Sequence, residues 1–424
     1  MLTKLEIIES KYTTFIIFFL SFYSFFGYLL PEFFPYLILA STLVFLFFFY
    51  LMKIQTPVSY NKLFPIYLLT AFIISELIMT RFSIYQTSST KIVFVRSTML
   101  AVGILLIIKS NISKKSLTLI FYFSFIHTFF TIISYLTPSL FAQIVLPFFP
   151  SSVRSANLIF LSNKVYAGIT DQVGRNAFYI STGIAVTFSD LLLNNFKKKK
   201  LKYLILGFFL LSLLLTGKRG PLVSNLISIL IVSTVYAKIQ GKTISFKIIK
   251  ISLSITVAII ALISFFPESM ITFERFTQNQ QGDQTSGRIF LFIYAIDLFL
   301  QKPFFGWGAG VFGNIYSRGN HNIFLQLLSE DGLWGFIIFT TFLFVNLYKT
   351  YRKLKIFNSK NESLFKIQAL LFSFYIQVFF LIYGLTGNPL NDGFILIIYL
   401  ISVTIPYTIK MGNNNIMSDV NVSK

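Results

Sequence analysis

The sequence of 424 residues contains no cysteine, two histidines and two tryptophans, and it is poor in acidic residues. Without cysteine the chain has no disulfide framework, no thiolate nucleophile and no cysteine metal ligand. Two histidines cannot form a histidine-rich zinc site and no Asp-x-Asp motif occurs, so we expect no metal centre. Asp and Glu number 15 against 36 Lys and Arg, which gives a formal net charge of +21. Chemistry in this chain must therefore rest mainly on arginine, lysine and histidine.

Apolar residues are what the chain has in excess. Hydrophobic residues make up 55% of it, aromatic residues 18% and charged residues 12%, and the mean hydropathy is +0.74. This composition excludes a soluble domain, and runs of about 17 to 21 apolar residues recur along the chain, each long enough to cross a bilayer as a helix. We therefore predict an all-α polytopic membrane protein with about twelve transmembrane helices in a single membrane domain, 1–424.

The predicted spans follow the apolar runs. They are 12–30, 33–52, 64–80, 92–108, 117–136, 176–193, 203–217, 221–236, 249–266, 325–348, 364–384 and 393–409. The first run lacks a small-residue cleavage pattern, so we interpret it as a retained span rather than a signal peptide.

The distribution of basic residues predicts the orientation. With the N-terminus inside, most lysines fall in cytoplasmic segments, as the positive-inside rule requires, and both termini are cytoplasmic. The run Lys197 to Lys200 then faces anionic lipid of the inner leaflet, and we expect no nucleic-acid partner. Arginine is instead concentrated outside, where a bidentate oxyanion binder indicates an anionic ligand. The predicted location is the bacterial cytoplasmic membrane, with the active site on its outer face.

Two outer loops are long enough to cover a cavity. They comprise residues 137–175, with the apolar piece Phe141 to Phe149 between prolines, and residues 267–324. In the second loop Ile289 to Leu300 is apolar but spans only about 18 Å as a helix. Making it a span would place the basic cluster after residue 348 outside, against the charge rule. We therefore expect short interfacial or re-entrant helices in these loops, which would roof the proposed active site.

The segment 286–335 gathers most of the polar residues that interrupt the apolar runs. Its motifs are Gly287-Arg288, Pro303-Phe304-Phe305-Gly306-Trp307-Gly308, His321-Asn322 and Glu330-Asp331-Gly332-Leu333-Trp334-Gly335. A membrane protein could hold charge and water together here, which is typical of an active site. The glycines at 306, 308 and 310 are not followed by the Gly-Lys-Ser/Thr of a nucleotide loop, so we interpret them as a chain reversal.

In order and spacing this segment resembles the bacterial O-antigen polymerase and O-antigen ligase family. Members of that family carry an arginine on an outer helix, a Pro-x-x-Gly-x-Gly turn, His-Asn, and a helix with Glu-x-Gly-x-x-Gly. The turn Thr216 to Gly220 resembles the family's Ser-Arg-Gly turn, with Lys218 where a serine is commoner, and Arg175 resembles a further arginine. The resemblance covers roughly residues 165 to 410, while the first five spans match in hydropathy alone.

The resemblance implies a metal-independent integral-membrane glycosyltransferase that needs no cofactor. Its donor and acceptor would be polyprenyl-pyrophosphate-linked oligosaccharides, and its partners membrane lipid, a flippase and a chain-length regulator of the same pathway. Arg175, Arg219 and Arg288 would bind the pyrophosphate, because fixed guanidinium groups stabilise the charge that develops on a leaving group. His321 would act on the acceptor hydroxyl together with Arg288 as catalytic residues. Asn322 and Glu330 would support them.

Each of these residues has a structural alternative. Arg288 could extend from an interfacial helix to lipid headgroups, and Arg219 could anchor two helix ends. Asn322 could cap the following helix, with His321 merely beside it. Glu330 lies nine residues after His321, so on one straight helix the two would face opposite ways. The second histidine, His127, lies midway along a predicted span and is interpreted as structural.

Three functions fit the sequence. The first is a polysaccharide polymerase that joins lipid-linked repeat units of a capsule or O-antigen at the outer leaflet, with inversion of the anomeric centre. The second is a ligase that moves the finished glycan to another acceptor through the same residues. The third is a transporter or flippase for anionic glycolipids, although we find no internal repeat of the kind common in transporters. Abundant Phe, Ile, Lys and Asn are typical of an AT-rich bacterial genome and favour a Gram-positive capsule polymerase.

Overall fold

The computed structural model describes residues 4–30, 40–41, 44, 60–109, 112–193, 199–241, 288–360 and 362–409. These residues form helices and no strand. The elements are α1 (Lys4–Phe26), η1 (Gly27–Leu29), α3 (Tyr60–Arg81), α4 (Gln86–Lys109), α5 (Lys114–Leu136), α6 (Pro138–Leu140), η2 (Phe141–Val145), η3 (Leu146–Phe148), α7 (Ser151–Ser162), α8 (Val173–Leu192), α9 (Lys199–Leu215), α10 (Arg219–Ile239), α13 (Arg288–Gln301), α14 (Val311–Tyr316), α15 (Ile323–Ser359), α16 (Leu364–Tyr383) and α17 (Gly393–Thr408).

The all-α membrane architecture predicted from the sequence is confirmed. Six of the described helices, within α3, α4, α5, α10, α15 and α16, are long and apolar enough to cross a membrane, and the shorter helices 13–29, 138–148 and 393–408 are also apolar. Every predicted span that falls in the described residues coincides with a helix. The spans predicted at 249–266 and, apart from isolated positions, at 33–52 lie outside the described residues.

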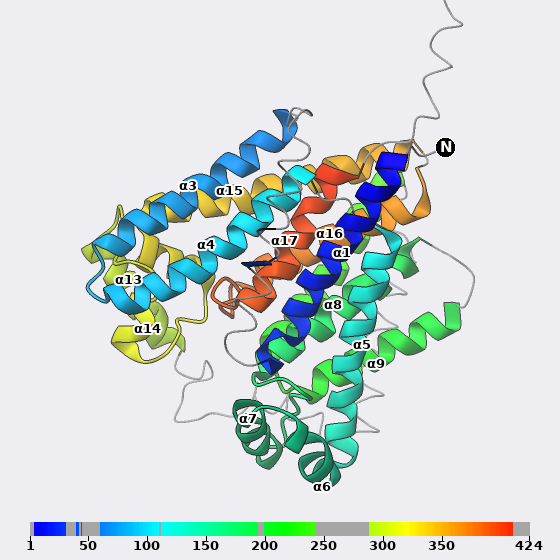
Figure 1. Ribbon diagram of the computed structural model, residues 1–424, viewed down its shortest axis with the longest axis horizontal. Helices are drawn as coiled ribbons and strands as arrows, with labels where there is room; N and C mark the ends of the chain where they lie inside the picture. Colours follow the sequence, from blue (N-terminus) through cyan, green and yellow to red (C-terminus); the bar gives the residue numbers. More distant parts are fainter. Residues whose placement is uncertain are drawn as a thin grey trace, which may run out of the picture.

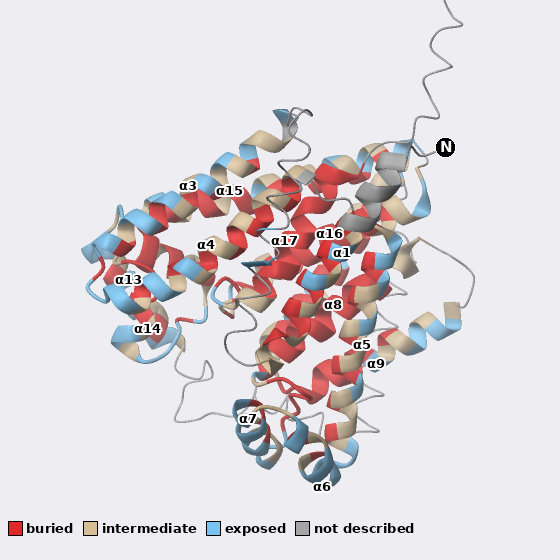
Figure 2. Cartoon of the chain, in the orientation of Figure 1, coloured by how far each residue is buried: buried red, intermediate tan, exposed pale blue. Residues whose placement is uncertain are grey.

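Three helices occupy the centre of the bundle. Along most of α8, α16 and α17 every side chain is buried, and these helices belong to one hydrophobic core that continues from α1 to the end of α17. Helices α16 and α17 lie between the group of α3, α4 and α15 and the group of α5, α8 and α9 (Figure 1). The burial colouring shows the same centre (Figure 2). Because it is surrounded, this centre can hold polar groups away from lipid.

Buried amide and hydroxyl groups tie the central helices together. The Asn225 amide of α10 donates to Ser181 of α8 at 2.7 Å, and the Tyr375 hydroxyl of α16 donates to the Asn225 side-chain oxygen at 2.8 Å. Tyr407 of α17 donates likewise to Asn346 of α15 at 2.7 Å. Interhelical hydrogen bonds of this kind contribute on average about 0.6 kcal/mol each in a membrane protein. Their value lies in fixing which helix faces which.

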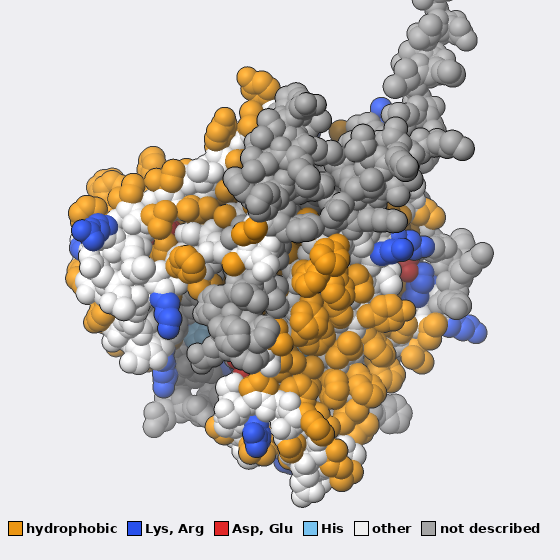
Figure 3. All heavy atoms as spheres, viewed as in Figure 1, with side chains coloured by type: hydrophobic (Ala, Val, Ile, Leu, Met, Phe, Trp, Pro, Cys, Tyr) orange, Lys and Arg blue, Asp and Glu red, His pale blue; other side chains and the backbone are white. Residues whose placement is uncertain are grey.

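The outer surface is strongly apolar, as lipid contact requires. Hydrophobic side chains cover the face over α1 and α5, and lysine and arginine lie toward its margins (Figure 3). The segment predicted to form an interfacial or re-entrant helix is α13, which packs against α15 and exposes Ile289, Phe290 and Ile293. The loop 137–175 contains the short helices α6, η2, η3 and α7. Their helical form is thus as expected, while their depth in the bilayer stays a prediction.

Helix α15 is broken at Gly332, and a glycine-rich turn docks into the break. Gly332 has φ +66° and ψ −168°, which no helix accommodates. Backbone N–H groups of Trp307 and Gly308 donate to the carbonyls of Ser329 and Glu330 at 3.2 and 2.8 Å. In return the N–H groups of residues 333 and 334 donate to the carbonyls of residues 303 and 304, at 2.8 and 3.2 Å. This joint attaches the turn after α13 rigidly to α15.

Candidate active site

A cavity of about 960 Å³ opens where the loops predicted to be external converge. Its wall is built from the end of α7 and the loop after it, the start of α8, the α9–α10 turn, the start of α13, the residue before the cap of α15, and the α16–α17 loop. These segments lie far apart in the sequence. Both outer loops, 137–175 and the described part of 267–324, contribute to the wall.

The structure brings four of the six predicted site residues to this cavity. Arg175, Arg219, Arg288 and His321 all line it. Asn322 and Glu330, predicted to be supporting, do not line it. Asn322 directly follows the lining residue His321, and Glu330 comes nine residues after His321 in α15. The fold therefore gathers these four side chains at one cavity.

His321 is held in an unusual backbone conformation at the start of α15. Its φ is +54°, in the left-handed region, where histidine is one of the few tolerated side chains, and its side chain is exposed to the cavity. The next residue, Asn322, caps α15, because its side-chain oxygen accepts from the N–H groups of Phe324 and Leu325 at 2.9 and 3.2 Å. The Ile323 N–H donates to the Gly384 carbonyl at 2.8 Å. The cap that the sequence left as an alternative is thus present, and it fixes the position of His321.

The electrostatic surroundings keep His321 neutral at physiological pH. Partial burial in the wall, and then the positive charges of Arg288, Lys218 and Arg318, lower the pKa of the imidazole below its ordinary value. Both causes disfavour the imidazolium form. A neutral imidazole has a lone pair that can accept a proton from a hydroxyl group.

Arg175 lies in the wall with its charge already balanced. Its Nε donates to Asp392 Oδ2 at 2.8 Å, and its terminal nitrogen pairs with Asp171. The guanidinium also stacks over the Phe394 ring, 4.7 Å from the centroid. Asp392 is held in turn, because its other oxygen caps α17 by accepting from the N–H groups of residues 394 and 395. This arginine therefore fixes the α16–α17 loop against α8, and its two carboxylates reduce its attraction for an anion.

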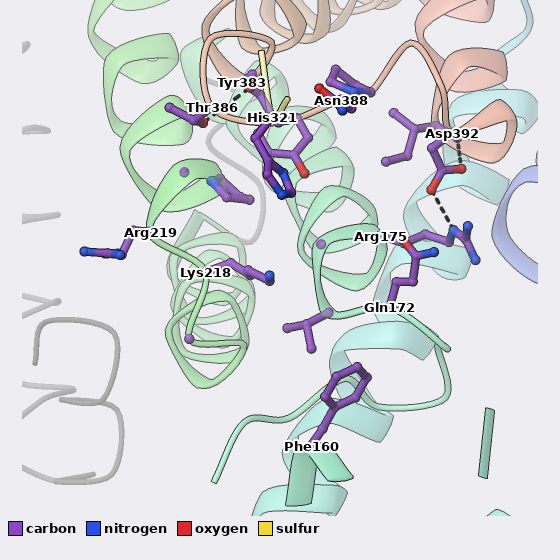
Figure 4. A pocket seen from close by; sticks show the side chains of 18 of the residues that line it. Phe160, Gln172, Arg175, Lys218, Arg219, His321, Tyr383, Thr386, Asn388 and Asp392 are labelled. Atoms are coloured by element: carbon purple, nitrogen blue, oxygen red, sulfur yellow. Dashed lines mark hydrogen bonds and ion pairs between the residues drawn. The ribbon is translucent and has the colours of Figure 1, made fainter. Parts of the chain in front are cut away.

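The α9–α10 turn places Lys218 and Arg219 in the cavity wall, on different sides of the start of α10. Gly217, with φ +63°, ends α9 and reverses the chain. In the close view the Lys218 side chain extends into the space below His321, whereas Arg219 extends from the opposite side of the start of α10 (Figure 4). The effect of the Lys218 charge on His321 agrees with this placement. Sequence reasoning had placed the anion contact on Arg219.

Several helices point their amino termini at the cavity. Val173 and Gly174 of α8, Arg219 and Gly220 of α10, and Arg288 of α13 are first-turn residues that line it. The residues preceding α8 and α10 make no capping side-chain hydrogen bond within the described part of the chain. The positive end of each helix dipole favours an anion at such termini. The backbone thus adds to the positive field of the side chains.

The buried carboxylates behind the cavity belong to a separate cluster. Glu330 accepts a hydrogen bond from Gln326 at 2.9 Å and others from the backbone N–H groups of Gly310 and Phe312. Arg96 pairs with Glu76, and its NH1 lies 4.0 Å from Asp331 Oδ2. Glu330 therefore supports the architecture around the α15 break rather than the cavity wall.

His127, interpreted from the sequence as structural, lies in the core. Its side chain is fully buried, its Nε2 is 3.0 Å from the Phe25 carbonyl oxygen, and its ring stacks on Phe26. It does not line the cavity. Among the described residues no group of three His, Cys, Asp or Glu side chains is arranged to hold a metal ion.

Sequence reasoning missed the contribution of the α16–α17 loop. Tyr383, Thr386, Asn388 and Asp392 all line the cavity, and none had been selected. A usable signal was present, since Thr386-Gly387-Asn388-Pro389 is a polar turn between two long apolar runs on the predicted outer side. The partner of Asp392, Arg175, lies 217 positions away in the sequence, which local patterns do not reveal.

Comparison with known proteins supports the resemblance noted in the sequence. Residues 204–340 match the family model described as O-antigen ligase, a range that includes Lys218, Arg288 and His321. No curated protein matches the chain. Members of the matched family are glycosyltransferase-like enzymes of the polymerase and ligase type, for which lipid-linked glycans are the implied substrates. Residues 204–340 are thus similar to the O-antigen ligase family, and they carry the arginine and histidine motifs that the sequence presents between Arg219 and Gly335.

Proposed function

We propose that this protein is a polysaccharide polymerase of the outer face of the bacterial cytoplasmic membrane. It would transfer the growing glycan from its polyprenyl pyrophosphate to the next lipid-linked repeat unit, as in capsule or O-antigen synthesis. The observation that carries the proposal is the cavity where Lys218, Arg288 and His321 meet, each from a different part of the matched domain. An anion-binding wall beside a neutral imidazole suits transfer from a pyrophosphate to a hydroxyl.

The cationic side of the cavity would hold the pyrophosphate. When the bond between the anomeric carbon and the phosphate oxygen breaks, the electron pair stays on that oxygen, and Lys218 and Arg288 would stabilise the resulting charge. The amino termini of α8 and α10 would add to this. Arg175 has two carboxylate partners, so we assign it to holding the α16–α17 loop and only secondarily to the pyrophosphate. Arg219 also lines the cavity, on the other side of the start of α10 from Lys218, and would meet the lipid-phosphate end of the donor.

His321 would act as the base on the acceptor. As the acceptor oxygen forms its bond to the anomeric carbon, its proton would pass to an imidazole nitrogen and later to water or the released pyrophosphate. A single displacement of this kind inverts the anomeric centre. General-base catalysis contributes about 10²- to 10⁴-fold to rate, and removing one fixed donor to a developing oxyanion costs about 10²- to 10³-fold. No metal ion or cofactor enters this scheme.

The test is product formation by purified protein supplied with synthetic polyprenyl-pyrophosphate repeat units, in EDTA and without nucleotide. Wild type should give a ladder of longer lipid-linked glycans. Arg288→Ala and His321→Ala should lose at least about 10²-fold in rate. Arg154→Ala is the matched control, because this exposed arginine of α7 does not line the cavity.

Two other outcomes would redirect the assignment. Transfer of a single finished glycan to a different lipid or wall acceptor, with the same dependence on Arg288 and His321, would make the protein a ligase. Absence of any transfer from a correct repeat unit, combined with movement of the lipid-linked glycan across vesicle membranes, would make it a transporter.

A further inference from the structure

A second, smaller cavity of about 270 Å³ lies next to the first, and its lining has a different chemistry. It is enclosed by α4, α14, the start of α15 and the α16–α17 loop. Its polar lining consists of side-chain amides and one carboxylate, from Asn314, Asn320, Gln326, Glu330, Asn388 and Asn391. Among the described residues no lysine or arginine lines it. Asn388 lines both cavities, so the two adjoin.

The amides of the smaller cavity are oriented by the protein at one end and unpaired at the other. The Gln326 nitrogen donates to Glu330 at 2.9 Å, and the Asn320 oxygen accepts from the Asn322 N–H at 3.2 Å. The opposite atoms, Gln326 Oε1 and Asn320 Nδ2, have no hydrogen-bond partner among the described residues. Both side chains are at most 2% exposed. Buried polar atoms in proteins are almost always paired, so a further molecule with hydroxyl groups is expected here.

Size and charge restrict what that molecule can be. The lining itself carries one carboxylate, Glu330, and no lysine or arginine among the described residues, so it does not favour an anion. The volume equals roughly nine water molecules at about 30 Å³ each, which is close to the lower limit of about 300 Å³ for small-molecule sites. The unpaired atoms are one donor, Asn320 Nδ2, and two acceptors, Gln326 Oε1 and Asn388 Oδ1. Such a set matches hydroxyl groups, because a hydroxyl group can both donate and accept.

We propose that this second cavity binds one neutral monosaccharide unit of the acceptor glycan. Asn320, which supplies the unpaired donor, directly precedes His321, the residue assigned above to the acceptor hydroxyl. A sugar held by Asn320 and Gln326 would therefore continue into the larger cavity past Asn388, on the side of the base. The assignment to the acceptor rests on the proposed polymerase function, whereas sugar binding itself does not.

Gly313 offers a way to fill the cavity without breaking a contact. It lines the cavity within α14, and a Cβ built on it would meet no described heavy atom within 4 Å. Gly207 in α9 has the same open surroundings but lines neither cavity. Gly313→Phe and Gly207→Phe are thus a matched pair. Gln326→Leu is an independent variant that keeps the side-chain bulk and removes the unpaired acceptor.

The experiment is saturation-transfer NMR of the full chain in nanodiscs with free glucose, galactose, rhamnose, N-acetylglucosamine and N-acetylgalactosamine. We expect at least one sugar to give a saturable signal with wild type, with Gly207→Phe and with Arg288→Ala. The signal should disappear in Gly313→Phe and correspond to about tenfold weaker binding in Gln326→Leu. Melting temperatures establish that each variant is folded. Should Gly313→Phe not fold, Gln326→Leu alone decides.

Two results would overturn the inference. One is the absence of a saturable signal from every sugar with wild type, which would leave the cavity to water. The other is a signal unchanged in both cavity variants. The elongation assay distinguishes this inference from the proposed function. If the protein elongates glycans but no sugar binds in the second cavity, the subsite is refuted and the polymerase assignment stands. If a sugar binds there but no glycan is elongated, the polymerase assignment is refuted and the subsite stands.

Discussion

Replacing Gly332 by alanine should unlock the joint between the glycine-rich turn and α15. The conformation at φ +66° and ψ −168° is almost confined to glycine and costs an L-residue about 1–3 kcal/mol. A Cβ at this position would lie 2.5 Å from the carbonyl carbon and oxygen of Phe304, which are backbone atoms that cannot rotate away. The turn must therefore shift and weaken hydrogen bonds worth about 1 kcal/mol each. Losing two of the four hydrogen bonds gives a total destabilisation of about 3–5 kcal/mol.

The tryptophans provide a local assay for this change. The chain has two, Trp307 and Trp334, and the backbone N–H of each takes part in the joint. Intrinsic fluorescence during thermal unfolding in detergent therefore reports on the joint itself. Gly332→Ala should lower the fluorescence melting temperature and also reduce elongation, because the joint sets the position of the Arg288-bearing helix relative to the His321-bearing helix.

Gly313→Ala is the control for Gly332→Ala. It has an ordinary helical φ and open space around the added methyl group, so it should be neutral or stabilising by up to about 1 kcal/mol. If Gly332→Ala melted together with Gly313→Ala and wild type, the argument that backbone contact across the break holds the turn would be refuted. A loss of activity with an unchanged fluorescence transition would refute it equally.

Three further predictions concern the cavity wall. Activity should fall on acidification only below pH about 6.5, because it needs neutral His321. Arg318→Gln should move this acid limb of the pH–rate profile to higher pH, because it removes a positive charge that lowers the pKa of His321. A limb that does not move would contradict this. Lys218→Met should reduce kcat/KM for elongation more than Arg219→Met, since Lys218 extends toward His321, and the reverse order would restore the assignment to Arg219. Asp392→Asn keeps the cap of α17, whereas Asp392→Ala loses it. The alanine variant should therefore be about 1 kcal/mol less stable than the asparagine variant, measured as a lower melting temperature. Equal melting temperatures of the two variants would mean that the cap is unimportant.

Local patterns predicted the helices and the motif residues, but not how the side chains are paired. Hydropathy is a property of consecutive residues, so it marked α16 and α17 correctly. The family motifs placed Arg288 and His321, which the fold brings to one wall. Neither could reveal that Arg175 pairs with Asp392, since that contact joins helices remote in the sequence.

The break in α15 and the direction of Lys218 were also beyond the sequence. A Glu-x-Gly-x-x-Gly pattern is compatible with a straight helix, and the left-handed conformation of Gly332 arises because the turn at Gly306 packs on it. Likewise, Lys218 and Arg219 are adjacent cations, and the reversal at Gly217 decides which of them extends toward His321. The helix α15 also extends to Ser359, past the predicted end of its span, because lysine and arginine favour helix where hydropathy ends.

The ion pair between Arg96 and Glu76 has a consequence for how the chain enters the membrane. A single charge at the centre of a bilayer costs about 3 kcal/mol, which would oppose insertion of α3 or α4 as separate helices. The two helices are consecutive, pack on each other and are joined by a short turn, so their charges can meet while the rest of the chain is still being synthesised. The guanidinium then donates to Asn391, in the last loop before α17. The same arginine thus first makes a hairpin acceptable to lipid and later joins it to the final helix, so chains truncated before residue 391 should insert the hairpin but leave it undocked.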